Sequence, residues 1–173
     1  FRHDEADGTG PEVAAVVAGY PGAAALTGDA ATCAATAHAL RSADVVHLAA
    51  HGKHVADNPL FSSVLLADGP LFAYELDGEP LSAGLVVLSA CEVGGATAVP
   101  GGQSLGLAAV LLRLGVRHVV AAVEPVSDEH AGAVMPRLHE LVRAGFDPAG
   151  ALAVVTADAG DASPFVCLTS DVA

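Results

Sequence analysis

A cysteine and a histidine in this sequence each follow an uncharged run of about six residues. Cys91 follows residues 85–90, His51 follows residues 45–50, and Gly52 comes directly after the histidine. Runs of this kind are typical of strands buried on both faces, and open parallel sheets place their chemistry where such strands end. A thiol becomes a nucleophile near neutral pH when a neighbouring imidazole lowers its pKa, and the imidazole then returns the proton to the leaving group. The two residues therefore predict a His-Cys pair.

The segments that must position this pair alternate between strand and helix patterns. Further strands are expected at residues 63–67, 116–123 and 165–169, and helices at residues 11–17, 103–114, 129–144 and 147–159. Another helix, rich in Ala, ends near Arg41 with Asp29 or Thr32 as its N-cap, and residues 68–70 are expected to form a tight turn. Alternation of this kind indicates an α/β fold with a largely parallel sheet between helices.

The composition indicates one acidic domain over residues 1–173. Hydrophobic side chains make up 53% of the chain, which suffices for one substantial core. The formal net charge is −13 with only 7 Lys and Arg residues, so we expect no nucleic-acid partner. The longest apolar tract, residues 104–123, is interrupted by Arg113 and Arg117, so we expect no membrane span. Because the first residue is Phe1, we expect a piece of a longer polypeptide.

The three cysteines lie far apart in the sequence and form no C-x-x-C motif. An odd count at these spacings favours neither a disulfide framework nor a thiolate zinc site, so we expect a reducing, cytoplasmic location. Cys33 and Cys167 fall in an expected helix and an expected strand without a His-Gly partner, and are interpreted as core residues.

Two other patterns have competing interpretations. His47, His51 and His54 have metal-like spacing, but no carboxylate or thiol at a suitable interval completes a site, so we expect no metal or other cofactor. Residues 102–106 match G-x-S-x-G, the nucleophile elbow of serine hydrolases. An elbow needs a strand directly before it, whereas a Gly-rich loop precedes this motif, so Ser104 is interpreted as part of the first turn of a helix.

Three phrases, in this order, closely resemble CHAT domains. They are VVHLAAHG at residues 45–52, PLFSSVLLADG at residues 59–69 and VVLSACEVG at residues 86–94. The resemblance runs from about Glu12 to Thr169 and implies a caspase-like three-layer α/β sandwich with helices on both faces. Such domains usually carry one more strand before the start of this chain, so we expect the chain to lack one N-terminal strand. Glu124 stands where many members carry Trp. Actinobacterial-type relatives often resemble this chain in that respect.

CHAT domains are caspase-like and separase-like cysteine peptidases, commonly fused to TPR repeats or other sensor modules. By this resemblance Cys91 is the nucleophile and His51 the catalytic histidine, with the backbone N–H groups of Gly52 and Cys91 around the oxyanion. A protein or peptide substrate and an upstream sensor region of the same polypeptide are the expected partners. The alternative is a catalytically silent interaction or scaffold module that has kept the fold.

The residues expected to bind the substrate are Ser89, Glu92, Glu124 and Asp128. Separase-like members that prefer Arg before the scissile bond place an acid at the end of the strand that follows the catalytic one, where this chain has Glu124 and Asp128. A carboxylate there would pair with Arg and repel Asp, so we expect a basic residue at P1, directly before the cut. Alternatively, Asp128 simply caps the helix that begins at residue 129.

Overall fold

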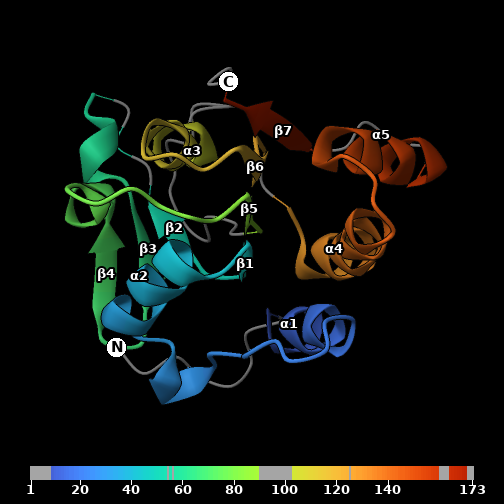
Figure 1. Ribbon diagram of the computed structural model, residues 1–173, viewed down its shortest axis with the longest axis horizontal. Coiled ribbons are helices and arrows are strands. Elements are labelled where there is room, and N and C mark those ends of the chain that lie inside the picture. The colour runs from blue at the N-terminus through green and yellow to red at the C-terminus, as the bar shows by residue number, and fades with distance from the viewer. Residues whose placement is uncertain are drawn as a thin grey trace.

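A four-stranded mixed sheet lies at the centre of the protein, with helices on both sides (Figure 1). The structure, a computed structural model, describes residues 9–53, 55, 57–89, 103–124, 126–159 and 164–170. The strand order is β1-β5-β6-β7, with β1 at Val45–Leu48, β5 at Leu85–Leu88, β6 at His118–Ala122 and β7 at Phe165–Thr169. The first three strands are parallel and β7 is antiparallel to β6. The predicted α/β fold with a mostly parallel sheet is confirmed.

The helices form two outer layers. On one face lie α1 (Thr9–Ala18), α4 (Asp128–Arg143) and α5 (Pro148–Ala159), and on the other lie α2 (Cys33–Ser42) and α3 (Gln103–Arg113) (Figure 1). The side chains of β5 alternate between the two resulting cores: Val86 and Leu88 join the α2/α3 core, and Leu85 and Val87 join the α1/α4/α5 core. These are the three layers of a caspase-like sandwich.

Burial on both faces explains the unbroken apolar runs of the central strands. Val86 and Val87 of β5 and Val119 and Val120 of β6 are all 0% exposed. A strand covered by helices on both faces reads as a continuous hydrophobic run instead of an alternating one. Full burial of each such side chain stabilises the fold by about 1.5–3 kcal/mol, so these residues of β5 and β6 contribute strongly to the stability of the sheet.

A smaller antiparallel sheet follows β1. It contains β2 (Gly52–Lys53), β3 (Ser63–Leu66) and β4 (Gly69–Phe72), in that order. The turn predicted at residues 68–70 is wrong, because Gly69 and Pro70 belong to β4 and the turn is formed by Ala67 and Asp68. Proline is tolerated there because β4 is an edge strand, where a residue without an N–H costs no ladder hydrogen bond.

Helix α2 resolves one of the open alternatives. The Thr32 hydroxyl accepts a hydrogen bond from the Ala35 N–H at 3.2 Å, and Thr32 has extended backbone angles. Thr32 is therefore the N-cap, whereas Asp29 lies in a separate 3₁₀ turn at Gly28–Ala30. On the same face of the sheet, Ser104 lies in the first turn of α3, as predicted.

Candidate active site

The candidate site lies beyond the carboxyl ends of β1 and β5. The last register pair of these parallel strands is Leu48 and Leu88, and the Ser89 N–H extends the ladder with a 3.0 Å hydrogen bond to the Leu48 carbonyl. Adjacent strands lie about 4.8 Å apart. His51 follows Leu48 by three residues, and Cys91 follows Leu88 by three residues. Cys91 and Glu92 themselves lie outside the residues that the structure describes.

The backbone around His51 is held by the small sheet. The His51 carbonyl accepts a hydrogen bond from the Leu65 N–H of β3 at 2.7 Å. The described part of the chain contains no cis peptide bond, and in a planar trans peptide the C=O and the following N–H point in opposite directions. The Gly52 N–H therefore points away from β3. The His51 side chain is partly buried and makes further interactions.

Ser89 is a buried polar residue at the end of β5. It is 7% exposed, and its Oγ has no hydrogen-bond partner among the residues that the structure describes. Because side chains alternate along a strand, Ser89 faces the same layer as Val87, between the sheet and helices α1 and α4. An unpaired buried hydroxyl costs about 1–3 kcal/mol, which marks Ser89 as a group that a substrate could satisfy.

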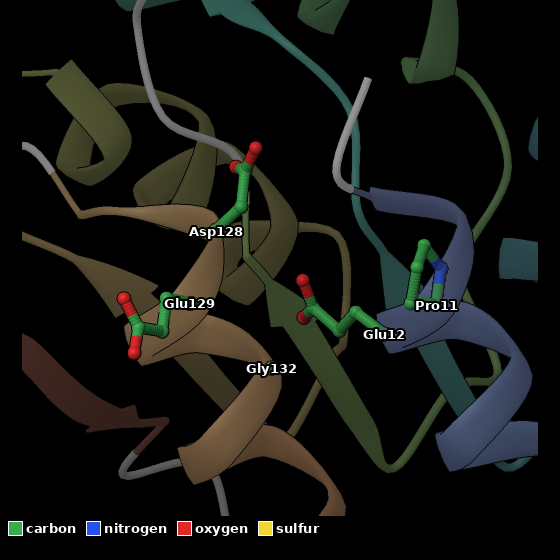
Figure 2. A pocket seen from close by; sticks show the side chains of 5 residues that line it. All are labelled: Pro11, Glu12, Asp128, Glu129 and Gly132. Carbon is green, nitrogen blue, oxygen red and sulfur yellow. The ribbon is translucent and has the colours of Figure 1, made fainter. Parts of the chain in front are cut away.

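An acidic pocket opens between the N-terminal ends of α1 and α4. Its cavity volume is about 320 Å³, and its walls are formed by Pro11, Glu12, Asp128, Glu129 and Gly132 (Figure 2). In Figure 2 Glu12 reaches from α1 toward α4, whereas Glu129 points away from α1. Asp128 is thus the carboxylate best placed to act on an occupant, because the Glu12 carboxylate is 3% exposed and lies 2.9 Å from Nε2 of His47.

The structure separates the two acids predicted to bind substrate. Asp128 lines the pocket, whereas Glu124 is an exposed residue that is not part of the pocket wall. The alternative in which Asp128 caps the helix is wrong: the Ser127 hydroxyl accepts from the His130 N–H at 3.2 Å, and Asp128 is the first residue of α4. Asp128 lies in the first turn of α4, where the helix dipole favours an acidic side chain, and it also lines the pocket.

Glu12 is a candidate residue that the sequence analysis did not identify. It is 3% exposed, and its Oε1 lies 2.9 Å from Nε2 of His47 on β1. The sequence contains one indication of its position, the spacing of four residues between Glu12 and Val16. Residues four apart lie on the same face of a helix, so Glu12 shares the inward face of α1 with the buried Val16. His47 is buried, as the apolar run around it suggests, with a side chain 7% exposed.

The two described cysteines do not have the properties of nucleophiles. Burial, followed by a hydrogen bond and charge from Asp68, raises the pKa of the Cys33 thiol to about 11. Burial raises the pKa of Cys167 as well, with Asp147 adding to the effect. Both are free thiols packed against the cores, partly exposed and not fully buried as core residues would be. Protonated thiols of this kind are poor nucleophiles.

The described residues contain neither a cluster of metal ligands nor a membrane-spanning helix. They contain no group of three or more His, Cys, Asp or Glu side chains arranged to hold a metal ion. Within the same residues no helix has the length and apolar character needed to cross a membrane.

Comparison with known proteins identifies the family. A search of curated proteins found no match. The family model described as CHAT domain matches residues 1–162, which is most of the 173-residue chain, and it includes the ends of β1 and β5. This family is associated with caspase-like cysteine peptidase domains, in agreement with the layered α/β fold seen here. The chain is a member of the CHAT domain family.

Proposed function

We propose that the protein is a cysteine endopeptidase that uses His51 and Cys91 as a catalytic dyad. The observation that carries this proposal is the register of β1 and β5, whose last paired residues, Leu48 and Leu88, each precede a dyad member by three residues. Residues that follow the paired ends of adjacent parallel strands by the same number of positions are expected at the same edge of the sheet, beyond the carboxyl ends of the strands. Membership of the CHAT family supports the same assignment.

In the proposed reaction the Cys91 sulfur attacks the scissile carbonyl carbon. His51 takes the thiol proton and delivers it to the leaving amine, so that the C–N bond breaks and an acyl-enzyme remains. Water then attacks the acyl carbon, with His51 accepting its proton, and the carboxylic acid product leaves as the thiol is restored. General acid-base catalysis of this kind contributes roughly 10²- to 10⁴-fold to the rate.

The proposed oxyanion donors are the backbone N–H groups of Gly52 and Cys91. The Gly52 N–H points away from β3, because the preceding carbonyl is bonded to Leu65, and is therefore not used by the small sheet. A preorganised N–H donor of this kind is worth on the order of 10²- to 10³-fold in kcat when it contacts the developing charge.

We further propose that the enzyme cleaves after a basic residue. The support is the acidic pocket between α1 and α4, in which Asp128 is exposed at the N-terminal end of its helix. An Arg side chain entering this pocket would meet the Asp128 carboxylate, with which it can form a bidentate pair, while an Asp side chain would be repelled. Ser89 and Glu92 are proposed to line the remainder of the subsite, and Glu124 is assigned a weaker, peripheral role.

A cytoplasmic location is part of the same proposal. Cys33 and Cys167 are both free, and a nucleophilic Cys91 must also stay reduced to act. A reducing compartment meets both needs. We propose that a sensor region of the same polypeptide controls the activity there.

Acyloxymethyl ketone probes test the dyad and the specificity together. The full-length protein is incubated with two probes that differ only in carrying Arg or Asp next to the reactive group, and labelled peptides are identified by mass spectrometry. The expected result is labelling at Cys91 by the Arg probe, lost in His51→Ala. Labelling of Cys91 by the Asp probe alone contradicts the proposed specificity. If neither probe labels Cys91, the result favours an interaction module without catalytic activity.

A further inference from the structure

Four polar side chains form a buried chain beneath β1. Oε1 of Glu12 on α1 lies 2.9 Å from Nε2 of His47, whose Nδ1 lies 3.1 Å from Nε2 of His139 on α4. Nδ1 of His139 lies in turn 2.9 Å from the hydroxyl of Tyr20, which follows α1. The side chains of Glu12, His47 and His139 are 3%, 7% and 2% exposed, so this part of the chain is largely shielded from water, whereas Tyr20 is partly buried.

Donor counting shows that all three hydrogen bonds can be made at once. Burial, and next the charge of His47, lower the pKa of His139 to about 3, so its ring is neutral and carries a single N–H. If the Tyr20 hydroxyl donates to Nδ1 of His139, the His139 Nε2–H donates to His47 and the His47 Nε2–H donates to Glu12. If His47 carries two protons, the first two bonds reverse and the third is kept. The chain therefore stays fully bonded in two protonation states.

Helix α1 depends on this chain for its attachment. Among the side chains of α1 that the structure describes, only Glu12 and Val16 are buried, whereas α4 buries six residues. Beyond the end of α1, the Arg143 guanidinium lies 5.6 Å from the centre of the Tyr20 ring, and a Cβ at Gly19 would come within 2.8 Å of Arg143 Nη1. Polar and cation-π contacts therefore join the apolar contact of Val16 in the seam between α1 and α4.

Strand β1 depends on the same chain for its position. Within the described parts of the chain it is an edge strand of four residues that pairs only with β5 in the four-stranded sheet. Val46 joins the α2/α3 core on one of its faces. On the other face Val45 packs against the α1/α4/α5 core, and His47 bonds to Glu12 and His139. His51 follows His47 by four residues, so any displacement of the strand moves the backbone that carries His51.

We propose that Glu12, His47, His139 and Tyr20 are positioning residues for His51, and that they make the docking of α1 and the placement of β1 one cooperative unit. Loss of α1 leaves the Nε2–H of His47 without the Glu12 acceptor, and an unpaired buried donor is costly, so β1 shifts when α1 leaves. The proposal rests on the proposed function only in treating His51 as the base for Cys91. Its mechanical part, the coupling of α1 to β1, stands on geometry alone.

Alkylation of Cys91 by iodoacetamide measures the position of His51 without a substrate. The full-length protein is labelled between pH 5.5 and 9, and peptide mapping separates Cys91 from Cys33 and Cys167. In the wild type an imidazole neighbour keeps the midpoint of the labelling profile low, and His51→Ala should slow labelling at pH 7 about tenfold by raising it. Tyr20→Phe keeps the ring under Arg143 and removes only the hydroxyl, so it should slow labelling about threefold with a partial shift of the midpoint.

Matched variants separate positioning from general destabilisation. Glu12→Gln keeps an acceptor for the His47 Nε2–H and should label like the wild type, while Glu12→Leu should resemble Tyr20→Phe. Thr32→Ala removes a helix cap on the opposite face and should leave the profile unchanged. If His51→Ala shifts the profile but Tyr20→Phe and Glu12→Leu do not, the positioning role is refuted and the dyad stands.

Hydrogen exchange tests the coupling of α1 to β1 by itself. This test remains valid even if His51→Ala has no effect on Cys91 labelling and the proposed dyad is wrong. Amides of residues 13–18 and 46–48 are followed by mass spectrometry in the wild type, Tyr20→Phe and Thr32→Ala. Coupling predicts that Tyr20→Phe accelerates exchange in both segments by the same factor, and that Thr32→Ala does not. Faster exchange in residues 13–18 alone would overturn the proposal.

Discussion

Nε2 of His47 lies 2.9 Å from Oε1 of Glu12, and the two side chains are 7% and 3% exposed. Removing Glu12 leaves the buried Nε2–H of His47 without an acceptor, and a buried polar group without a partner costs about 1–3 kcal/mol. Glu12→Leu should therefore lower the free energy of unfolding by about 3 kcal/mol, and Glu12→Gln, which still accepts the hydrogen bond, by roughly 1 kcal/mol. Urea unfolding measures both values, and equal losses would mean that the His47 contact contributes nothing.

His139 makes the stability depend on pH in a defined window. Its pKa is lowered from 6.5 to about 3, chiefly by burial. Below pH 6.5 the unfolded chain therefore binds a proton that the folded chain rejects, and stability falls as the pH decreases from 6.5 toward 3. The slope approaches about 1.4 kcal/mol per pH unit for this one group. His139→Gln removes this titration, so the difference between the two unfolding curves should grow between pH 6.5 and 4.5; parallel curves would show that His139 titrates normally.

Cys91→Ala should abolish turnover and leave the fold intact. The substitution removes the proposed nucleophile, and in the sequence Cys91 comes three residues after the last residue of β5. Peptide cleavage should fall to background while Tm changes by no more than 2 °C or so, in line with the small effects of substitutions outside cores. Cys167→Ala serves as the control and should keep full cleavage activity. Cleavage by Cys91→Ala at the wild-type rate would exclude Cys91 from the reaction.

Asp128 should determine the preference for a basic residue before the cut. Asp128→Asn removes the charge while preserving shape, and hydrogen bonds to a charged group contribute about 1.5–3 kcal/mol. The kcat/KM for an Arg substrate should therefore fall at least tenfold, with little change for a matched substrate that carries norleucine. Glu124→Gln is the control, because Glu124 is exposed and does not line the pocket, and its effect should be below twofold. The reverse order of effects would move the specificity determinant to Glu124.

Much of the fold was predictable because its elements have strong local signals. The strand expected at residues 165–169 is β7 without change, and the helix expected at residues 147–159 is α5 to within one residue. The segments 45–50 and 85–90 contain β1 and β5, although each strand ends earlier than expected. Apolar runs and proline or Thr caps act over a few residues, so they can be recognised without knowledge of the tertiary structure.

The buried polar chain was not predictable, because its members are far apart in the sequence. His47 and His139 are separated by 92 residues, and Glu12 precedes His47 by 35. Neither pairing has a local signature, and a histidine in an apolar strand gives no indication of the helix that will cover it. The cap of α4 was missed for a different reason: Ser127 and Asp128 are both good cap residues, and only the backbone angles distinguish them.

Pro70 and Glu75 together prevent the small sheet from growing. The Ala73 N–H donates to the Ser62 carbonyl at 2.8 Å, which fixes the hydrogen-bond pattern between β3 and β4. In this pattern the backbone N–H positions of residues 70 and 72 point away from β3, toward the open side of the edge strand β4. Pro70 has no N–H to offer there, and the Phe72 N–H donates to Glu75 Oε2 at 2.8 Å. An approaching strand would find neither outward donor available, which protects the domain against strand addition and aggregation along this edge.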